Sequence, residues 1–189
     1  MKIIIAILIL MIYPLTNMAQ SINIKYEYCI DLFCLLDTSY IMKTNGINHQ
    51  YNSNKDIEIV LINKIDSSYL IMTHYPGDDI GKMSLFEVGY LINMDKTIVS
   101  SYNETNSTLS TNNNTALGVP MDNIIALQGL PDSISVQNNY TVFHYIEDDP
   151  ESIILQKYNE YIYFIEYWFM DNKLSRMILG LNILRNNIY

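Results

Sequence analysis

The chain has 189 residues, of which 49% are hydrophobic and 16% are charged. This composition is sufficient for a packed core and excludes a chain that is disordered throughout. The formal net charge is −9, and the lysines and arginines are scattered singly along the chain. Because binding to a phosphate backbone needs several clustered cations, this pattern argues against nucleic acid and anionic membrane surfaces as partners.

Residues 1–19 have the layout of a secretory signal peptide. Lys2 supplies a positive charge, residues 3–13 are an unbroken apolar run, Pro14 interrupts it, and Ala19 is the small residue at the expected cleavage site. The apolar run is shorter than the ~20 residues that a membrane-spanning helix needs. We therefore expect an exported protein, periplasmic or secreted, without a membrane span after cleavage; an uncleaved anchor is the alternative. No cysteine lies at the cleavage site, so no lipid anchor is expected.

Cys29 and Cys34 are the two cysteines of the chain. Export favours a disulfide between them. However, five residues of strand would separate their Cα atoms by about 16 Å, whereas a disulfide needs a separation within about 7 Å. The intervening residues 30–33 contain no Gly or Pro to form a turn. A disulfide and two buried thiols therefore both stay open. No Cys/His metal site is expected, because the histidines lie far apart in sequence.

The first half of the mature chain, residues 20–102, is expected to be a β-rich subdomain. Residues 30–41 partly fit a helix. Short apolar runs separated by turn residues then predict an antiparallel meander, with strands at residues 57–65, 69–74, 85–93 and 96–101. Residues 103–115 are rich in Asn, Ser and Thr, and their low complexity predicts a linker.

Residues 116–189 are expected to form a second subdomain that begins with a short helix. Pro120 suits the first helical turn, Gly129 suits the left-handed position after the last turn, and Pro131 prevents continuation. Strands are predicted at residues 140–146, 161–170 and 173–181, the last two joined by a two-residue turn. The predicted fold class is α+β: an antiparallel meander followed by a short helix packed on an antiparallel sheet.

The two-residue turn at Asp171-Asn172 predicts the pairing of the last two strands. Phe169 should face Leu174, and Ile165 should face Ile178. These pairs, with Tyr163 and Tyr167, are expected on the sheet face that packs against the helix.

Three short motifs suggest a resemblance. They are Leu117-Gly118, Gly129-Leu130-Pro131, and Tyr167-Trp168-Phe169 with Asp171-Asn172-Lys173-Leu174. Together they resemble the unit of the BamE/SmpA (OmlA)-type envelope lipoproteins and of the similar β-lactamase-inhibitor-like fold, over residues 116–181. The resemblance implies a helix-plus-sheet unit that holds other proteins. It does not imply a role in outer-membrane assembly, because the lipid-attachment cysteine is missing and Pro120 stands where that family usually has a Ser or Thr cap.

The sequence contains no clear catalytic constellation. His74 with Asp78 and Asp79 could supply a base and a carboxylate, but no nucleophile motif accompanies them. The acidic residues at 147–151 lack the spacing of a calcium-binding loop. We therefore assign no catalytic, cofactor-binding or metal-binding residue and expect no cofactor and no enzyme activity.

The aromatic residues of the strand at 161–170 are the candidate binding surface: Tyr161, Tyr163, Tyr167 and Trp168. Because a strand alternates, half of them could instead be core residues. The leading hypothesis is a non-catalytic module that binds another envelope or extracellular protein. One alternative is a small-ligand-binding protein or hydrolase with a pocket between the two halves. Another is an immunity or inhibitor protein whose acidity matches a basic target.

Overall fold

A computed structural model describes residues 26–37, 49–51, 57–74, 83–94 and 103–181. The expectations for residues 1–19 and 96–101, and for Asp78 and Asp79, lie outside these ranges. The strands are β1 (Cys29–Ile30), β2 (Phe33–Cys34), β3 (His49–Tyr51), β4 (Ile57–Asn63), β5 (Ser68–His74), β6 (Leu85–Tyr90), β7 (Asn103–Thr105), β8 (Ser133–Gln137), β9 (Tyr140–Glu147), β10 (Tyr163–Met170) and β11 (Lys173–Leu181). The helices are the short 3-10 helix η1 (Leu91–Asn93), α2 (Met121–Gln128) and α3 (Ile153–Tyr158).

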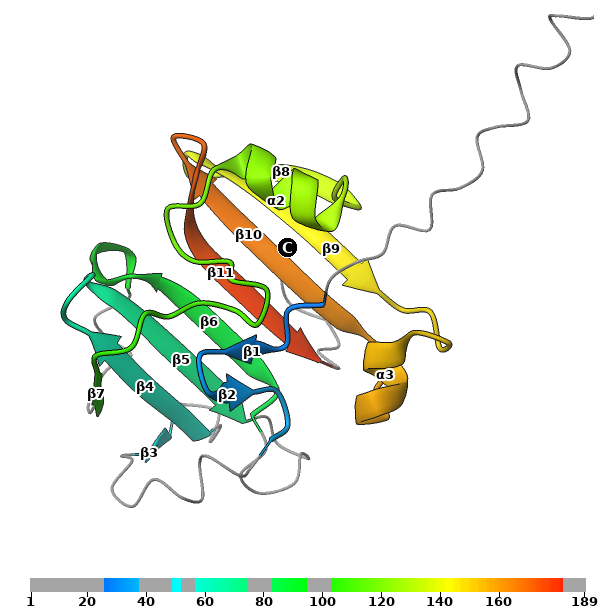
Figure 1. The fold of residues 1–189 in the computed structure, drawn as a ribbon, viewed down its shortest axis with the longest axis horizontal. Coiled ribbons are helices and arrows are strands. Elements are labelled where there is room, and N and C mark those ends of the chain that lie inside the picture. The colour runs from blue at the N-terminus through cyan, green and yellow to red at the C-terminus, as the bar shows by residue number, and fades with distance from the viewer. Residues whose placement is uncertain (1–25, 38–48, 52–56, 75–82, 95–102, 182–189) are drawn as a thin grey trace, which may run out of the picture.

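One large sheet organises the described part of the chain (Figure 1). Its strand order is β3-β4-β5-β6-β11-β10-β9-β8, and β7 pairs with β4. All pairings are antiparallel except that of β7 with β4. The predicted α+β class, with an antiparallel meander and a helix on an antiparallel sheet, is confirmed.

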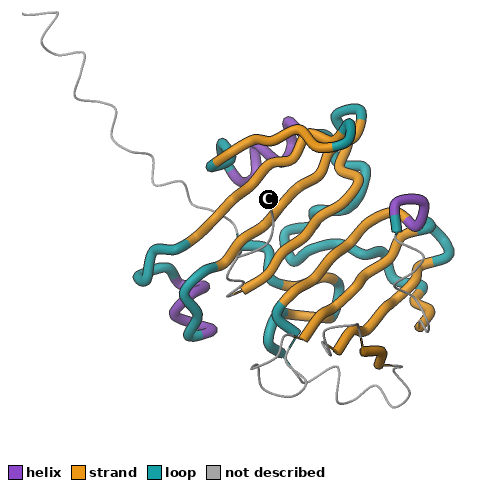
Figure 2. The backbone as a smooth tube through the Cα atoms, turned by 180° about the vertical axis from the view of Figure 1, so that it is seen from behind, coloured by secondary structure: helices purple, strands orange, loops and turns teal. Residues whose placement is uncertain are grey.

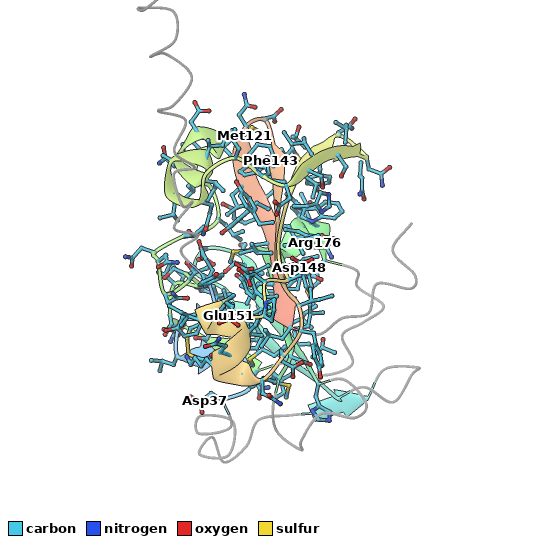
Figure 3. The ribbon with its side chains drawn as sticks, turned by 90° about the vertical axis from the view of Figure 1, so that its right-hand side faces the viewer. Asp37, Met121, Phe143, Asp148, Glu151 and Arg176 are labelled. Atoms are coloured by element: carbon cyan, nitrogen blue, oxygen red, sulfur yellow. A yellow bond between two sulfur atoms is a disulfide. The ribbon has the colours of Figure 1, made fainter. Side chains whose placement is uncertain are left out.

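The main core lies on one face of this sheet. The hairpin of β1 and β2, the helix α2 and the segment that leads into α2 cross the front of the sheet in Figure 1. Ile30, Leu109 and Ile124 from these covering segments are buried against sheet residues such as Phe86 and Tyr167. Viewed from behind, in Figure 2, the strands face the viewer and α2 lies beyond them. The side view in Figure 3 places Met121 of α2 and Arg176 of β11 on opposite sides of the sheet.

The two halves of the chain are not separated in space. β6 of the first half pairs directly with β11 of the second, with Phe86 opposite Leu179 and Val88 opposite Met177. The interpretation of residues 103–115 as a linker is also inconsistent with the structure, because Leu109 belongs to the main core. This segment of low complexity therefore contains one core residue, Leu109, and the short parallel strand β7.

Residues 30–34 form a hairpin rather than the start of a helix. Asp31 adopts a positive φ of 53°, which Asp tolerates better than most residues. This turn brings Cys29 opposite Cys34, with Cα atoms 3.9 Å apart, and the two form a disulfide. Of the two readings left open by the sequence, the disulfide is the one observed. A turn without Gly or Pro made the geometry possible.

The turn that joins β10 to β11 is confirmed, but the predicted register is right only at its beginning. Asp171 and Asn172 both have positive φ, and Phe169 faces Leu174 as expected. Beyond a bulge between Trp168 and Phe169 the register shifts, so Ile165 faces Leu179 and not Ile178. One extra residue in β11 is enough to cause this shift.

Helix α2 occupies the predicted position. Pro120 lies in extended conformation just before the helix and not within its first turn. The N–H of Met121 donates to the carbonyl oxygen of Asn172 at 3.0 Å, which satisfies one of the free donors at the helix start. Gly129 ends the helix with a φ of 87°, and Pro131 follows. No helix in the described ranges is long and apolar enough to cross a membrane.

Candidate functional site

Strand β8 ends the sheet and is the site that sequence reasoning missed. Its sequence, SISVQ, alternates polar and β-branched residues, which is the strand signal. Asn138 and Asn139 both have positive φ and form a two-residue turn that returns the chain as β9, with Gln137 opposite Tyr140. Among the strands that the structure describes, β8 pairs with β9 alone. Its other backbone edge pairs with no strand in the described part of the chain.

One face of β8 is apolar and exposed. Ile134 and Val136 are 59% and 77% exposed, and Leu130, just after α2, is 74% exposed. Ile134 lies opposite Phe143 on β9, which is fully covered as part of the main core. Helix α2 thus covers the inner strands, while the apolar side chains of the edge strand extend beyond it. Edge strands usually carry charges or Pro that prevent pairing, and β8 has neither.

The charges near this edge are acidic and gather at one end. Asp132 precedes β8 and accepts a hydrogen bond from the backbone N–H of Ile146 at 2.7 Å. Because β8 and β9 are antiparallel, the loop after β9 lies at the same end. That loop contributes the exposed residues Asp148, Asp149 and Glu151, and Figure 3 shows Asp148 and Glu151 close to α3.

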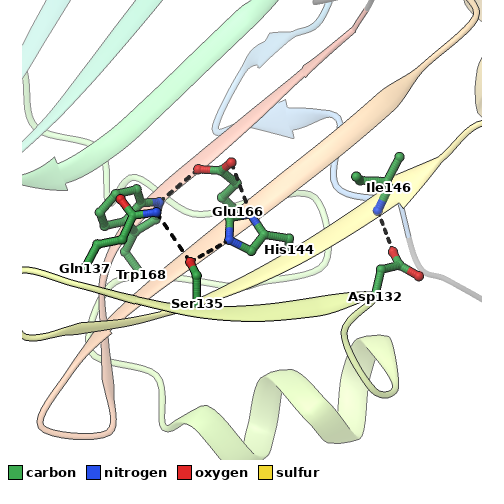
Figure 4. Close-up of polar contacts among 7 residues, drawn as sticks. All are labelled: Asp132, Ser135, Gln137, His144, Ile146, Glu166 and Trp168. Carbon is green, nitrogen blue, oxygen red and sulfur yellow. Dashed lines mark hydrogen bonds and ion pairs between the residues drawn. The ribbon is translucent and has the colours of Figure 1, made fainter. Parts of the chain in front are cut away.

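The opposite face of β8 begins a row of polar side chains (Figure 4). Ser135 Oγ lies 2.9 Å from His144 Nε2 on β9. His144 Nδ1 lies 3.3 Å from Glu166 Oε1 on β10, which is an ion pair only when the imidazole is protonated. The two atoms are not aligned for a hydrogen bond. The indole Nε1 of Trp168 donates to Glu166 Oε2 at 3.1 Å. Gln137 Nε2 donates to Ser135 Oγ at 3.4 Å.

The same row continues across the sheet through Arg176. Its guanidinium carbon lies 5.0 Å from the centre of the Trp168 ring, and Nη2 donates to Glu87 at 2.8 Å. Glu87 also accepts a hydrogen bond of 2.6 Å from Tyr69. Burial lowers the pKa of Arg176, but the charge and hydrogen bond of Glu87, together with the charges of Tyr69 and Glu166, outweigh this and leave that pKa raised. Burial and the Glu87 charge raise the pKa of Tyr69, so the phenol stays protonated.

A second polar cluster is buried in the core around Glu27. Thr115, Tyr167 and Gln128 donate to its Oε1 at 2.6, 2.9 and 3.1 Å. Burial raises the pKa of Glu27, although these donors and the hydroxyl of Thr111 act to lower it. The second oxygen, Oε2, is buried without a hydrogen bond of ordinary geometry. The cluster fixes the N-terminal segment to α2 and β10, which is a structural role.

The structure separates the four aromatic residues of the candidate binding surface. Tyr163 and Tyr167 are fully buried in the main core, so for these two residues the core alternative holds and they are not part of a binding surface. Tyr161 is 80% exposed and precedes β10, whereas Trp168 is partly buried on the other face, beside Tyr140. Strand alternation places Trp168 on the other face, and Tyr161 is exposed because it lies before the first residue of β10.

The expected pocket between the two halves has a counterpart in the described residues. A hollow of about 460 Å³ is lined by Tyr90 and Asn93 from the first half and by Gly118, Asp171 and Lys173 from the second. His74, the base suggested by the sequence, does not line it and is buried on β5. Within the described ranges no group of His, Cys, Asp and Glu is arranged to hold a metal ion.

Comparisons with protein-family models, with curated proteins and with solved structures find no match to this chain. The resemblance of residues 116–181 to the BamE/SmpA-type unit therefore stays a prediction.

Proposed function

We propose that the chain is an exported binding module that holds a partner protein by adding an extended segment of that partner to β8. The observation that carries this proposal is the combination of a sheet edge that pairs with no other described strand and the exposed side chains of Ile134 and Val136. Strand addition uses both, because backbone hydrogen bonds give affinity and alternate side chains give specificity. The signal-like residues 1–19 and the disulfide of Cys29 with Cys34 support export.

The acidic end of the edge defines the chemistry of the partner. Asp132 and the loop residues Asp148, Asp149 and Glu151 present negative charge next to the start of β8. A segment with alternating apolar residues and Lys or Arg at one end matches this surface. A second copy of the chain matches less well, because each copy carries a formal charge of −9 and like charges repel at an interface.

Site-specific crosslinking in the native host tests this proposal. A photoreactive amino acid replaces Val136, and crosslinked proteins are identified by mass spectrometry. We expect a crosslink to a basic, extended segment of one partner, which Ile134→Lys reduces at least tenfold, since a lysine on an edge strand opposes pairing. Ile65→Lys is the matched control, because Ile65 is 75% exposed but lies in the turn between β4 and β5.

Hydrogen exchange separates strand addition from other modes of binding. A partner strand protects the backbone amides of β8 that point away from β9, whereas a partner that contacts only side chains leaves them exchanging. Crosslinks that persist in Ile134→Lys, or an edge that stays unprotected with the partner bound, would overturn the proposal. So would a symmetric dimer of this chain through β8.

A further inference from the structure

We propose that Ser135 is an activated nucleophile, with His144 as its general base and Glu166 as the residue that orients this base. This inference concerns the face of β8 opposite Ile134 and does not depend on the proposed binding of a partner. It assigns an acyl-transfer activity toward carboxylic esters to residues that no sequence motif connects.

Three neighbouring strands place these side chains in one row. His144 and Glu166 are direct cross-strand partners, and Ser135 lies diagonally from His144, because Ser133 is its direct partner. The resulting distances are 2.9 Å from Ser135 Oγ to His144 Nε2 and 3.3 Å from His144 Nδ1 to Glu166 Oε1. The order of nucleophile, base and carboxylate is the one that activates a serine hydroxyl. The contact between His144 and Glu166 is not yet aligned as a hydrogen bond, and catalytic hydrogen bonds often align only when a substrate is bound.

Burial increases along the row from Ser135 to Glu166, which suits an accessible nucleophile and a buried carboxylate. Ser135 is partly exposed, whereas the side chains of His144 and Glu166 are 12% and 7% exposed. A substrate can therefore approach the hydroxyl while the carboxylate acts in a surrounding that screens charge poorly. Such a carboxylate stabilises the imidazolium that forms during proton transfer.

Residues around the row hold the carboxylate and offer a further donor. Trp168 donates to Glu166 Oε2 at 3.1 Å, which leaves Oε1 directed toward His144. The exposed amide Nε2 of Gln137 lies 3.4 Å from Ser135 Oγ. From there it can donate to the oxygen that becomes negative when a carbonyl carbon next to Oγ turns tetrahedral.

The reaction has two balanced steps. Ser135 Oγ forms a bond to the ester carbonyl carbon as its proton passes to His144 Nε2, and the carbon–oxygen bond to the alcohol then breaks as that proton moves to the leaving oxygen. Water attacks the acyl-serine in the same way and gives its proton to His144, which returns it to Oγ. The products are an alcohol and a carboxylic acid, and nothing is oxidised or reduced.

A fluorophosphonate probe tests the nucleophile without knowledge of the natural substrate. The probe forms a bond between Ser135 Oγ and phosphorus and releases fluoride, and mass spectrometry of the labelled full-length chain locates the modified residue. We expect labelling at Ser135 that is absent in Ser135→Ala. Ser133→Ala is the matched control, since Ser133 lies on the same face of the same strand, and it should label as the unchanged chain does.

Two further variants distinguish an activated serine from a structural contact. His144→Gln should slow labelling roughly 100-fold or more, which is the contribution of a general base. Glu166→Gln, whose amide oxygen can still accept from Trp168, should slow labelling without loss of fold by circular dichroism. No labelling at Ser135, labelling at another serine, or an unchanged rate in folded His144→Gln would each overturn the proposal.

Discussion

The carboxylate of Glu27 accepts a hydrogen bond of 2.9 Å from the hydroxyl of Tyr167, 140 residues further along the chain. The backbone of Glu27 is also fixed, because Tyr163 donates to its carbonyl oxygen at 2.8 Å. Two tyrosines of β10 therefore hold the segment before the β1–β2 hairpin against the sheet. The aromatic strand that the sequence suggested as a surface instead anchors the N-terminal part of the core.

This contact predicts an unusual pH dependence of stability. Because burial raises the pKa of Glu27, the folded chain retains this proton at pH values where the unfolded chain has lost it. Its contribution to stability is full below the ordinary pKa of 4.5 and decreases as pH rises through the raised pKa. In Glu27→Gln this decrease disappears, so in denaturant unfolding the stability of the variant relative to the unchanged chain should increase as pH rises above 4.5. An equal slope in both proteins would contradict the prediction.

Truncation of the same residue should have the opposite effect. In Glu27→Ala, the donors of Thr115, Gln128 and Tyr167 lose the acceptor that they share. Buried donors without a partner are costly, and we expect a loss of roughly 3 kcal/mol in unfolding free energy. The loss should be largest below the ordinary pKa of 4.5 and should become smaller as pH rises, because the variant also lacks the titrating carboxyl.

Reduction of the disulfide should loosen the hairpin that covers the sheet. Cys29 and Cys34 close a short loop, for which the chain-entropy argument gives about 2 kcal/mol. Ile30 and Leu35, both fully buried, are held by this hairpin. Cys29→Ser with Cys34→Ser should lower the unfolding free energy by about this amount in chemical denaturation. Addition of a reductant to the double variant should have no further effect.

Local sequence signals predicted most of the fold. Two errors, the register at Ile165 and the turn at Asp31, each depend on the conformation of a single residue or on one inserted residue. The turn at Asp171-Asn172 and the helix between Pro120 and Gly129 follow from backbone preferences of those residues. The register at Ile165 could not be predicted, because the bulge that shifts it depends on how β11 meets β6 as well as β10. The turn at Asp31 was not predicted, because a positive φ at Asp has only a weak sequence signal.

The candidate site was harder to predict than the fold. The alternation in SISVQ and the following Asn138-Asn139 turn could have identified β8. The row of Ser135, His144 and Glu166 could not have been found, because it needs the pairing of three strands in a known register. His144 alone is indistinguishable in sequence from a structural histidine in a strand.

The close approach of Gly89 to Tyr69 predicts that a side chain at position 89 would clash with the tyrosine ring. These residues face each other on β6 and β5, and a Cβ on Gly89 would lie 2.7 Å from the hydroxyl oxygen of Tyr69. Gly89→Ala should displace the ring, break its hydrogen bond to Glu87 and lower the unfolding free energy by roughly 2 kcal/mol. In the background of Tyr69→Ala the same change should cost much less. A double-mutant cycle with equal costs in both backgrounds would exclude this explanation.

The acidic end of β8 predicts an effect on the rate of partner association. Asp132→Asn keeps an oxygen that can accept from the N–H of Ile146 but removes the charge, so stability should change by less than about 0.5 kcal/mol. Association with the proposed basic partner should become slower and less dependent on salt, since charges near an interface act mainly on the association rate. Glu104→Gln removes the same charge from β7, where Glu104 pairs with Lys64 at the other side of the sheet. Association rates measured over a range of ionic strength should separate the two variants, and an equal effect of both would mean that net charge, and not the β8 edge, attracts the partner.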